Sequence, residues 1–69
     1  MLLKIEKFER FARQHGFQSG GSLLRDLGCG EHAYSRYRKG GKVNSDVVME
    51  LYCRYGDEVL DAIDFEDNV

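Results

Sequence analysis

The chain has 69 residues, the size of one small domain that spans residues 1–69. Hydrophobic residues make up 42% of the sequence and aromatic residues 12%, which indicates a packed core and excludes a disordered chain. The formal net charge is −2, and no apolar stretch approaches the roughly 18 residues of a membrane span, so we expect a cytoplasmic protein that does not enter a membrane.

Residues 5–15 carry apolar side chains at helical spacing and predict the first helix. The inward side is predicted to hold Ile5, Phe8, Phe11 and Ala12. The outward side is predicted to hold Glu6, Lys7, Glu9, Arg10 and Arg13. Gly16 ends the helix, because glycine readily adopts the left-handed conformation that commonly follows a helix.

A break at residues 19–22 precedes the second predicted helix, and either Ser19 or Ser22 can cap it by accepting a backbone N–H with its hydroxyl. The apolar side of this helix is predicted to hold Leu23, Leu24 and Leu27. Gly28 closes the helix, and Cys29 follows as a buried turn residue. The glycine pair at 20–21 weakens the start of the helix, since a glycine within a helix costs roughly 0.5–1 kcal/mol relative to alanine.

The third predicted helix runs from about Glu31 to Arg38. The residues predicted to face inward are Ala33, Tyr34 and Tyr37. The residues left on the outward side are Glu31, His32, Ser35 and Arg36. A basic, glycine-containing loop at residues 39–42 follows and ends the helix.

The fourth predicted helix begins at Asn44 or Ser45, either of which can cap it, and Gly56 stops it. Its apolar side is predicted to hold Val47, Val48, Leu51, Tyr52 and Tyr55. A short fifth helix is predicted to start at Asp57 and to bury Val59, Leu60 and Ile63, with Phe65 closing the core. No segment alternates between apolar and polar residues as a strand does. The sequence therefore predicts a compact all-α bundle of five helices.

Charge is distributed unevenly along the chain. Residues 1–42 carry nine Lys and Arg against four Asp and Glu, whereas residues 43–69 carry one against eight. Solvation alone requires some surface charge on a small domain. The basic residues gather around the second and third predicted helices, however, which favours a face that meets phosphate.

The two cysteines do not form a disulfide framework. Cys29 and His32 have a C-x-x-H spacing, and His15 with Cys53 would complete four zinc ligands. Structural zinc sites usually show two closely spaced ligand pairs, and only one pair is present here. The sequence therefore favours two small apolar cysteines in a reducing compartment, and we expect neither a metal nor a cofactor.

Residues 23–40 combine a short helix, a tight glycine turn and a second short helix, which is the pattern of a helix-turn-helix. Leu27-Gly28, Cys29, Tyr34, Tyr37 and Gly40 stand where the lambda-repressor-like helix-turn-helix family (phage repressors and Cro) has its characteristic residues. The chain resembles this family over residues 5 to 65. The resemblance implies a sequence-specific, DNA-binding transcriptional regulator of phage or mobile-element type, acting as a repressor or accessory factor.

The resemblance also implies which residues contact double-stranded DNA. Base edges in the major groove would be read by Glu31, His32 and Arg36. Phosphates would be contacted by Ser19, Ser22, Lys39 and Lys42. Arg38 stands where relatives usually carry Glu, and it reaches either a phosphate or the acidic half of the chain. The guanidinium of an arginine can form two hydrogen bonds to a guanine. The carboxylate of Glu31 would also be favourable in the first turn of a helix without any ligand, because it interacts with the helix dipole.

A module of this size buries about 600–1,000 Å² on DNA, so useful affinity requires a homodimer on a palindromic site with half-sites about 34 Å apart. Dimer contacts would come from the fifth helix and Phe65 or from residues 1–3, and the alternative is that these terminal apolar residues fill the core. The alternative is a protein-interaction module with the same fold, whose acidic C-terminal half binds a protein partner. We expect no enzyme, because the sequence shows no catalytic constellation and the chain leaves little room for a water-excluding pocket.

Overall fold

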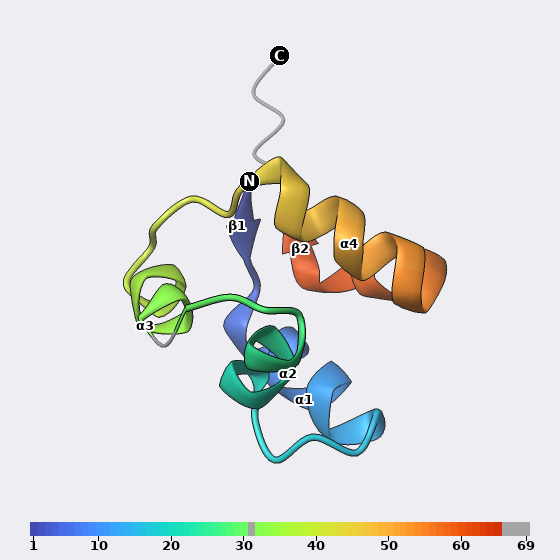
Figure 1. Cartoon of the computed structure of the whole chain (residues 1–69). Helices are drawn as coiled ribbons and strands as arrows, with labels where there is room; N and C mark the ends of the chain where they lie inside the picture. The colour runs from blue at the N-terminus through green and yellow to red at the C-terminus, as the bar shows by residue number, and fades with distance from the viewer. Residues whose placement is uncertain (31, 66–69) are drawn as a thin grey trace.

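The computed structural model describes residues 1–30 and 32–65 (Figure 1). These residues form four α-helices: α1 (Ile5–Gln14), α2 (Gly20–Asp26), α3 (Ala33–Arg38) and α4 (Ser45–Tyr55). A 3-10 helix, η1 (Gly56–Ala62), follows α4 directly, and two short strands, β1 (Leu2–Leu3) and β2 (Ile63–Asp64), flank the helices in sequence. The predicted compact, mostly helical domain is confirmed. The prediction of five α-helices is wrong, because the fifth segment is a 3-10 helix that leads directly into a strand.

The strands β1 and β2 form an antiparallel pair in which Leu2 lies opposite Asp64 and Leu3 opposite Ile63. The N–H of Lys4 extends the pairing by donating to the carbonyl of Ala62 at 2.8 Å. This pairing contradicts the prediction of a purely α-helical chain. Strands of two residues are too short to show alternation in a sequence, so only the fold reveals that the two ends of the chain pair.

The hydrophobic core is formed by the buried sides of the helices packed against one another. Its largest fully buried side chains are Phe8, Leu23, Leu24, Leu51 and Val59. Two predicted core positions are wrong, since Tyr52 is 44% exposed and Phe65 is 48% exposed. The buried side of α4 is narrow, and Tyr52 is turned away by the roughly 100° rotation that separates it from the preceding residue on an α-helix. Phe65 follows the last paired residues of β2, so it is not carried into the core.

Of the two serines that the sequence offers as caps for α2, Ser19 caps the helix. The Oγ of Ser19 accepts a hydrogen bond from the N–H of Ser22 at 3.2 Å, so Ser19 is the N-cap and Ser22 lies within the first turn. At the other end, Gly28 has a φ of +93° and the N–H of Cys29 donates to the carbonyl of Leu24 at 3.0 Å. A left-handed glycine at this position turns the chain from α2 towards α3.

Gly20 lies where α2 meets both α1 and α3. A Cβ at this position would lie 2.7 Å from Cδ2 of Phe8 and 2.8 Å from Cζ of Tyr34. Gly20 lowers the helix propensity of α2, but the absence of a side chain here is what lets α1, α2 and α3 pack closely against one another. In Figure 1, α3 lies at one side of the molecule, with β1 between it and the pair formed by α4 and β2.

Candidate nucleic-acid interface

The helix α3 has a buried side and an exposed side. Ala33 is 6% exposed and Tyr37 is 5% exposed, as expected of residues that face the core. Ser35 and Arg36 are exposed on the opposite side. His32 is also exposed but lies directly before the helix, because α3 begins at Ala33 and not at about Glu31 as the sequence predicts. The third predicted base-contacting residue, Glu31, lies outside the described residues. The described part of α3 therefore presents a polar surface that includes a cationic side chain.

The side chain of Arg36 makes no hydrogen bond or ion pair with any residue in 1–30 or 32–65. Its backbone is held firmly, because the carbonyl of Arg36 accepts a hydrogen bond from the N–H of Gly41 at 2.8 Å. A Cβ at Gly41 would lie 2.7 Å from that carbonyl oxygen, so the loop can close only with a glycine here. A fixed backbone and a guanidinium that no described residue engages suit a residue that contacts a ligand.

The predicted phosphate contacts fall into two groups. Lys39 and Lys42 are exposed in the segment after α3. Ser19 and Ser22 are half-buried at the start of α2, and their hydroxyl oxygens lie 3.3 Å apart. The hydroxyl of Ser19 already serves the cap, so the helix start explains this serine without a ligand.

Arg38 lies over the ring of Tyr34, with 5.9 Å between its Cζ atom and the ring centroid. A guanidinium at this distance from an aromatic face is attracted by the ring. Within the described part of the chain, Arg38 pairs with no carboxylate. Of its two predicted roles, a contact with phosphate or with the acidic half of the chain, the second is therefore not supported by any described contact.

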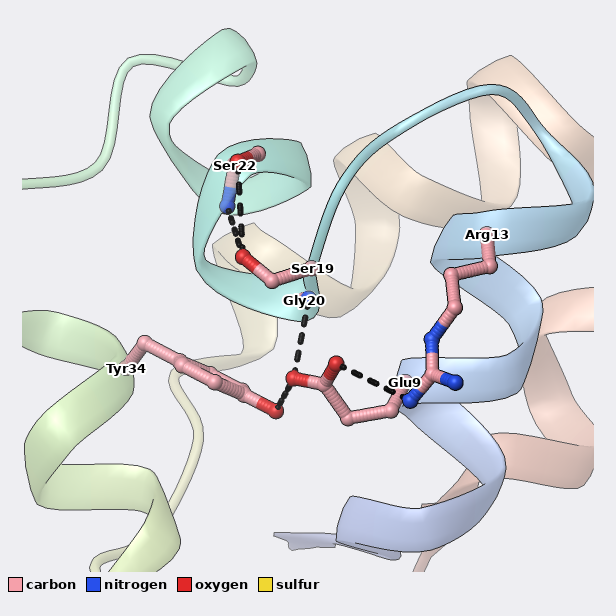
Figure 2. Close-up of polar contacts among 6 residues, drawn as sticks. All are labelled: Glu9, Arg13, Ser19, Gly20, Ser22 and Tyr34. Carbon is pink, nitrogen blue, oxygen red and sulfur yellow. Dashed lines mark hydrogen bonds and ion pairs between the residues drawn. The ribbon is translucent and has the colours of Figure 1, made fainter.

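A polar cluster that the sequence analysis missed joins α1, α2 and α3 (Figure 2). The Oε1 atom of Glu9 accepts hydrogen bonds from the hydroxyl of Tyr34 and from the N–H of Gly20, the latter at 3.0 Å. Its Oε2 atom lies 3.6 Å from Nη2 of Arg13. The prediction that Glu9 belongs to a solvated outer side is therefore wrong. The sequence around Glu9 does not indicate this contact, because its partner Tyr34 lies 25 positions further along the chain.

Protonation within this cluster follows from its contacts. Burial alone would raise the pKa of Glu9, but the hydrogen bonds from Tyr34 and Gly20 and the charge of Arg13 together lower it. Burial, and then the hydrogen bond to Glu9, raise the pKa of Tyr34. Near neutral pH the carboxylate is thus a charged acceptor and the phenol a protonated donor. Such a charge-assisted hydrogen bond is stronger than one between neutral groups.

The acidic residue at the end of α2, Asp26, is paired with an arginine. Between residues 17 and 45, Asp26 is the one acidic residue that the structure describes, and its Oδ2 atom lies 3.2 Å from Nη1 of Arg54. The Nε atom of Arg54 also donates to Glu50 at 3.2 Å, so one arginine of α4 serves two carboxylates. The described charge around α2 and α3 is consequently basic.

The cysteines lie in different environments. Cys29 is half-buried and Cys53 is exposed, and the described residues contain no group of three or more His, Cys, Asp or Glu that could hold a metal ion. Burial raises the pKa of the Cys29 thiol, which favours the protonated form that does not bind metal. None of the described helices has the length and apolarity needed to cross a membrane.

Comparisons with known proteins give no match to a family model, to a curated protein or to a solved structure. The resemblance to lambda-repressor-like regulators therefore stays a prediction that depends on the residues quoted for it. Function has to be argued from the geometry and charge of this chain.

Proposed function

We propose that this protein is a sequence-specific, DNA-binding transcriptional regulator of phage or mobile-element type that places α3 in the major groove. The observation that carries the proposal is the two-sided character of α3. Its inner side is buried through Ala33 and Tyr37, while Arg36 stands exposed with no described partner. A helix held in this way can enter a groove without giving up its own packing.

The distribution of charge supports the same proposal. Arg36, Arg38, Lys39 and Lys42 are all exposed and lie on α3 or directly after it. The described acidic residues of the C-terminal half lie on α4, η1 and β2 and are also exposed: Asp46, Glu50, Asp57, Glu58, Asp61 and Asp64. A molecule with one basic and one acidic region is oriented by the field of DNA, so that its basic region approaches the phosphates.

Each residue has a role that suits its chemistry. Arg36 would bond a guanine through both arms of its guanidinium, and His32 would donate to a base or a phosphate. Lys39 and Lys42 would bind phosphates and fix the position of the protein along the duplex. Two copies of the chain would occupy the two halves of a palindromic site.

A second candidate is a protein-interaction module, and exposed apolar residues on α4 favour it. Met49 is 62% exposed and Tyr52 is 44% exposed, and a spacing of three residues places them on the same side of the helix. Exposed apolar residues beside charged ones are typical of surfaces that bind other proteins.

The deciding experiment is selection of bound duplexes from a random pool, followed by affinity measurements on the selected duplex and on a scrambled one at several salt concentrations. The DNA-binding proposal predicts an enriched site, weaker binding to the scrambled duplex, and affinity that falls steeply with salt. It also predicts two half-sites about 34 Å apart, or a multiple of that spacing. Failure to bind any duplex at low salt would exclude this function and favour the protein-interaction module.

A further inference from the structure

A shallow hollow of about 180 Å³ lies at the elbow between α2 and α3. We call it the elbow hollow. Apart from one leucine, the hollow is lined by glycines, polar residues and one aromatic ring: Gly21, Arg25, Gly30, Tyr34, Ser35 and Arg38. Arg25 is not among the residues for which the sequence predicts a ligand. The hollow therefore combines one residue with an expected role, Arg38, and one without.

The charge of the elbow hollow is cationic. Arg25 comes from the last turn of α2 and Arg38 from the last turn of α3, so the two helices bring together guanidinium groups that lie 13 positions apart in sequence. Both side chains are exposed, and neither pairs with a carboxylate within 1–30 or 32–65. None of the lining residues that the structure describes is acidic.

The aromatic wall of the hollow is fixed in place. The hydroxyl of Tyr34 donates to Glu9, and a Cβ at Gly21 would lie 3.3 Å from Cδ2 of the ring, which shows how closely α2 approaches it (Figure 2). The guanidinium of Arg38 lies over the same ring. The ring thus attracts the Arg38 guanidinium at the side of the hollow.

The groups around the hollow are mainly hydrogen-bond donors. Each guanidinium offers a planar set of N–H donors, and the hydroxyl of Ser35 can add another. Ser35 and Arg38 also line an adjoining hollow with Lys39, which extends the cationic surface along α3. A phosphate group offers several acceptor oxygens and matches the geometry of guanidinium groups, so it is the ligand that this donor set fits.

We propose that the elbow hollow binds a single phosphate group, held jointly by Arg25 and Arg38 and by the hydroxyl of Ser35. This inference rests on the proposed function, in which the phosphate belongs to the backbone of the duplex that α3 enters. Arg25 and Arg38 act together on one phosphate in this arrangement. They do not contact two separate phosphates.

If Arg25 and Arg38 bind the same phosphate, the salt dependence of DNA binding measures it. Each phosphate that is neutralised contributes about 0.9 to the slope of log affinity against log salt. Because two arginines share one phosphate, Arg25→Gln and Arg38→Gln should each lower the slope by less than this amount. The double variant should lower the slope by about one unit in total. Sequence preference should stay unchanged, since phosphate contacts carry no base information.

The matched control is Arg10→Gln, which makes the same change in net charge on an exposed residue of α1. Arg10 lines one hollow between α1 and η1 and another along α1, and it is absent from the elbow hollow. Its slope should equal that of the unchanged protein. A double-variant loss of about two units, no loss, or an equal loss in the control would overturn the proposal. Thermal unfolding of each variant checks that the fold is kept.

A second measurement separates this inference from the proposed function. Inorganic phosphate is titrated into the full chain at constant ionic strength, and amide shifts are followed by NMR. Saturating shifts at Gly21, Gly30 and Ser35 that disappear in Arg25→Gln would support the hollow, even if no duplex binds. In that case the phosphate site would stand and the DNA-binding function would fail. Duplex binding with an unchanged slope in the double variant and no local shifts would leave the function standing and exclude the hollow.

Discussion

The carboxylate of Glu9 on α1 accepts a hydrogen bond from the hydroxyl of Tyr34 on α3, and the same oxygen accepts the N–H of Gly20 at the start of α2. One side chain therefore joins the three helices that position the candidate DNA-binding surface (Figure 2). The contact holds α3 from its inner side and leaves Ser35 and Arg36 on its outer side exposed.

Tyr34→Phe should reduce stability, because it removes the hydroxyl that donates to Glu9 while keeping the ring. Loss of a hydrogen bond to a charged acceptor costs about 1–2 kcal/mol in a half-buried setting. Chemical denaturation of the two proteins measures the difference. Tyr52→Phe is the matched control, since the hydroxyl of Tyr52 also hydrogen-bonds a carboxylate, that of Asp57, but at an exposed position on α4 where such a contact should change stability little. Equal effects of the two substitutions would contradict a special role of the Glu9 contact.

Glu9→Gln should flatten the acid limb of the stability profile. The pKa of Glu9 is lower in the folded protein than its ordinary value of 4.5, so the folded state holds the charged form more strongly than the unfolded state does. The resulting stability is present above pH 4.5 and disappears as the pH falls through the lowered folded value. Thermal unfolding between pH 7 and pH 2 should therefore show a smaller acid-induced loss for the variant. Parallel profiles would mean that Glu9 contributes nothing to the pH dependence.

Gly20→Ala should destabilise the fold, because the added Cβ would press against the rings of Phe8 and Tyr34. Overpacking of this kind costs about 1–3 kcal/mol. Gly30→Ala is the comparison, since a Cβ there would meet nothing within 4 Å. That substitution should be neutral or stabilise by about 0.4–1 kcal/mol, by restricting the unfolded chain. Urea midpoints of both variants test the pair, and a stable Gly20→Ala protein would show that the helices can move apart freely.

Arg36→Ala should relax sequence preference at one or two base pairs without changing the melting temperature. An arginine that bonds a guanine with both arms contributes about 1–3 kcal/mol of discrimination. Stability should be unaffected, because the side chain is exposed and makes no ion pair with the described residues. Affinities for single-base variants of a selected site give the measurement. A fall in melting temperature would identify Arg36 as a structural residue.

The positions of the first four helices follow from local chemistry, and the sequence predicts them well. Apolar residues at helical spacing and stop glycines such as Gly28 act through neighbouring residues alone, so they can be recognised without a fold. The outward direction of Arg36 follows from the same periodicity, since Ala33 and Tyr37 take up the buried side of α3.

Tertiary structure alone decided the features that depend on residues distant in sequence. The contact between Glu9 and Tyr34, the pairing of β1 with β2 and the placing of Arg25 and Arg38 around one hollow all require the chain to fold back on itself. Helical periodicity reports only which side of a helix is apolar. It does not report which polar side chain lies opposite another, and that is why the sequence predicts the candidate recognition helix but not the contacts that hold it.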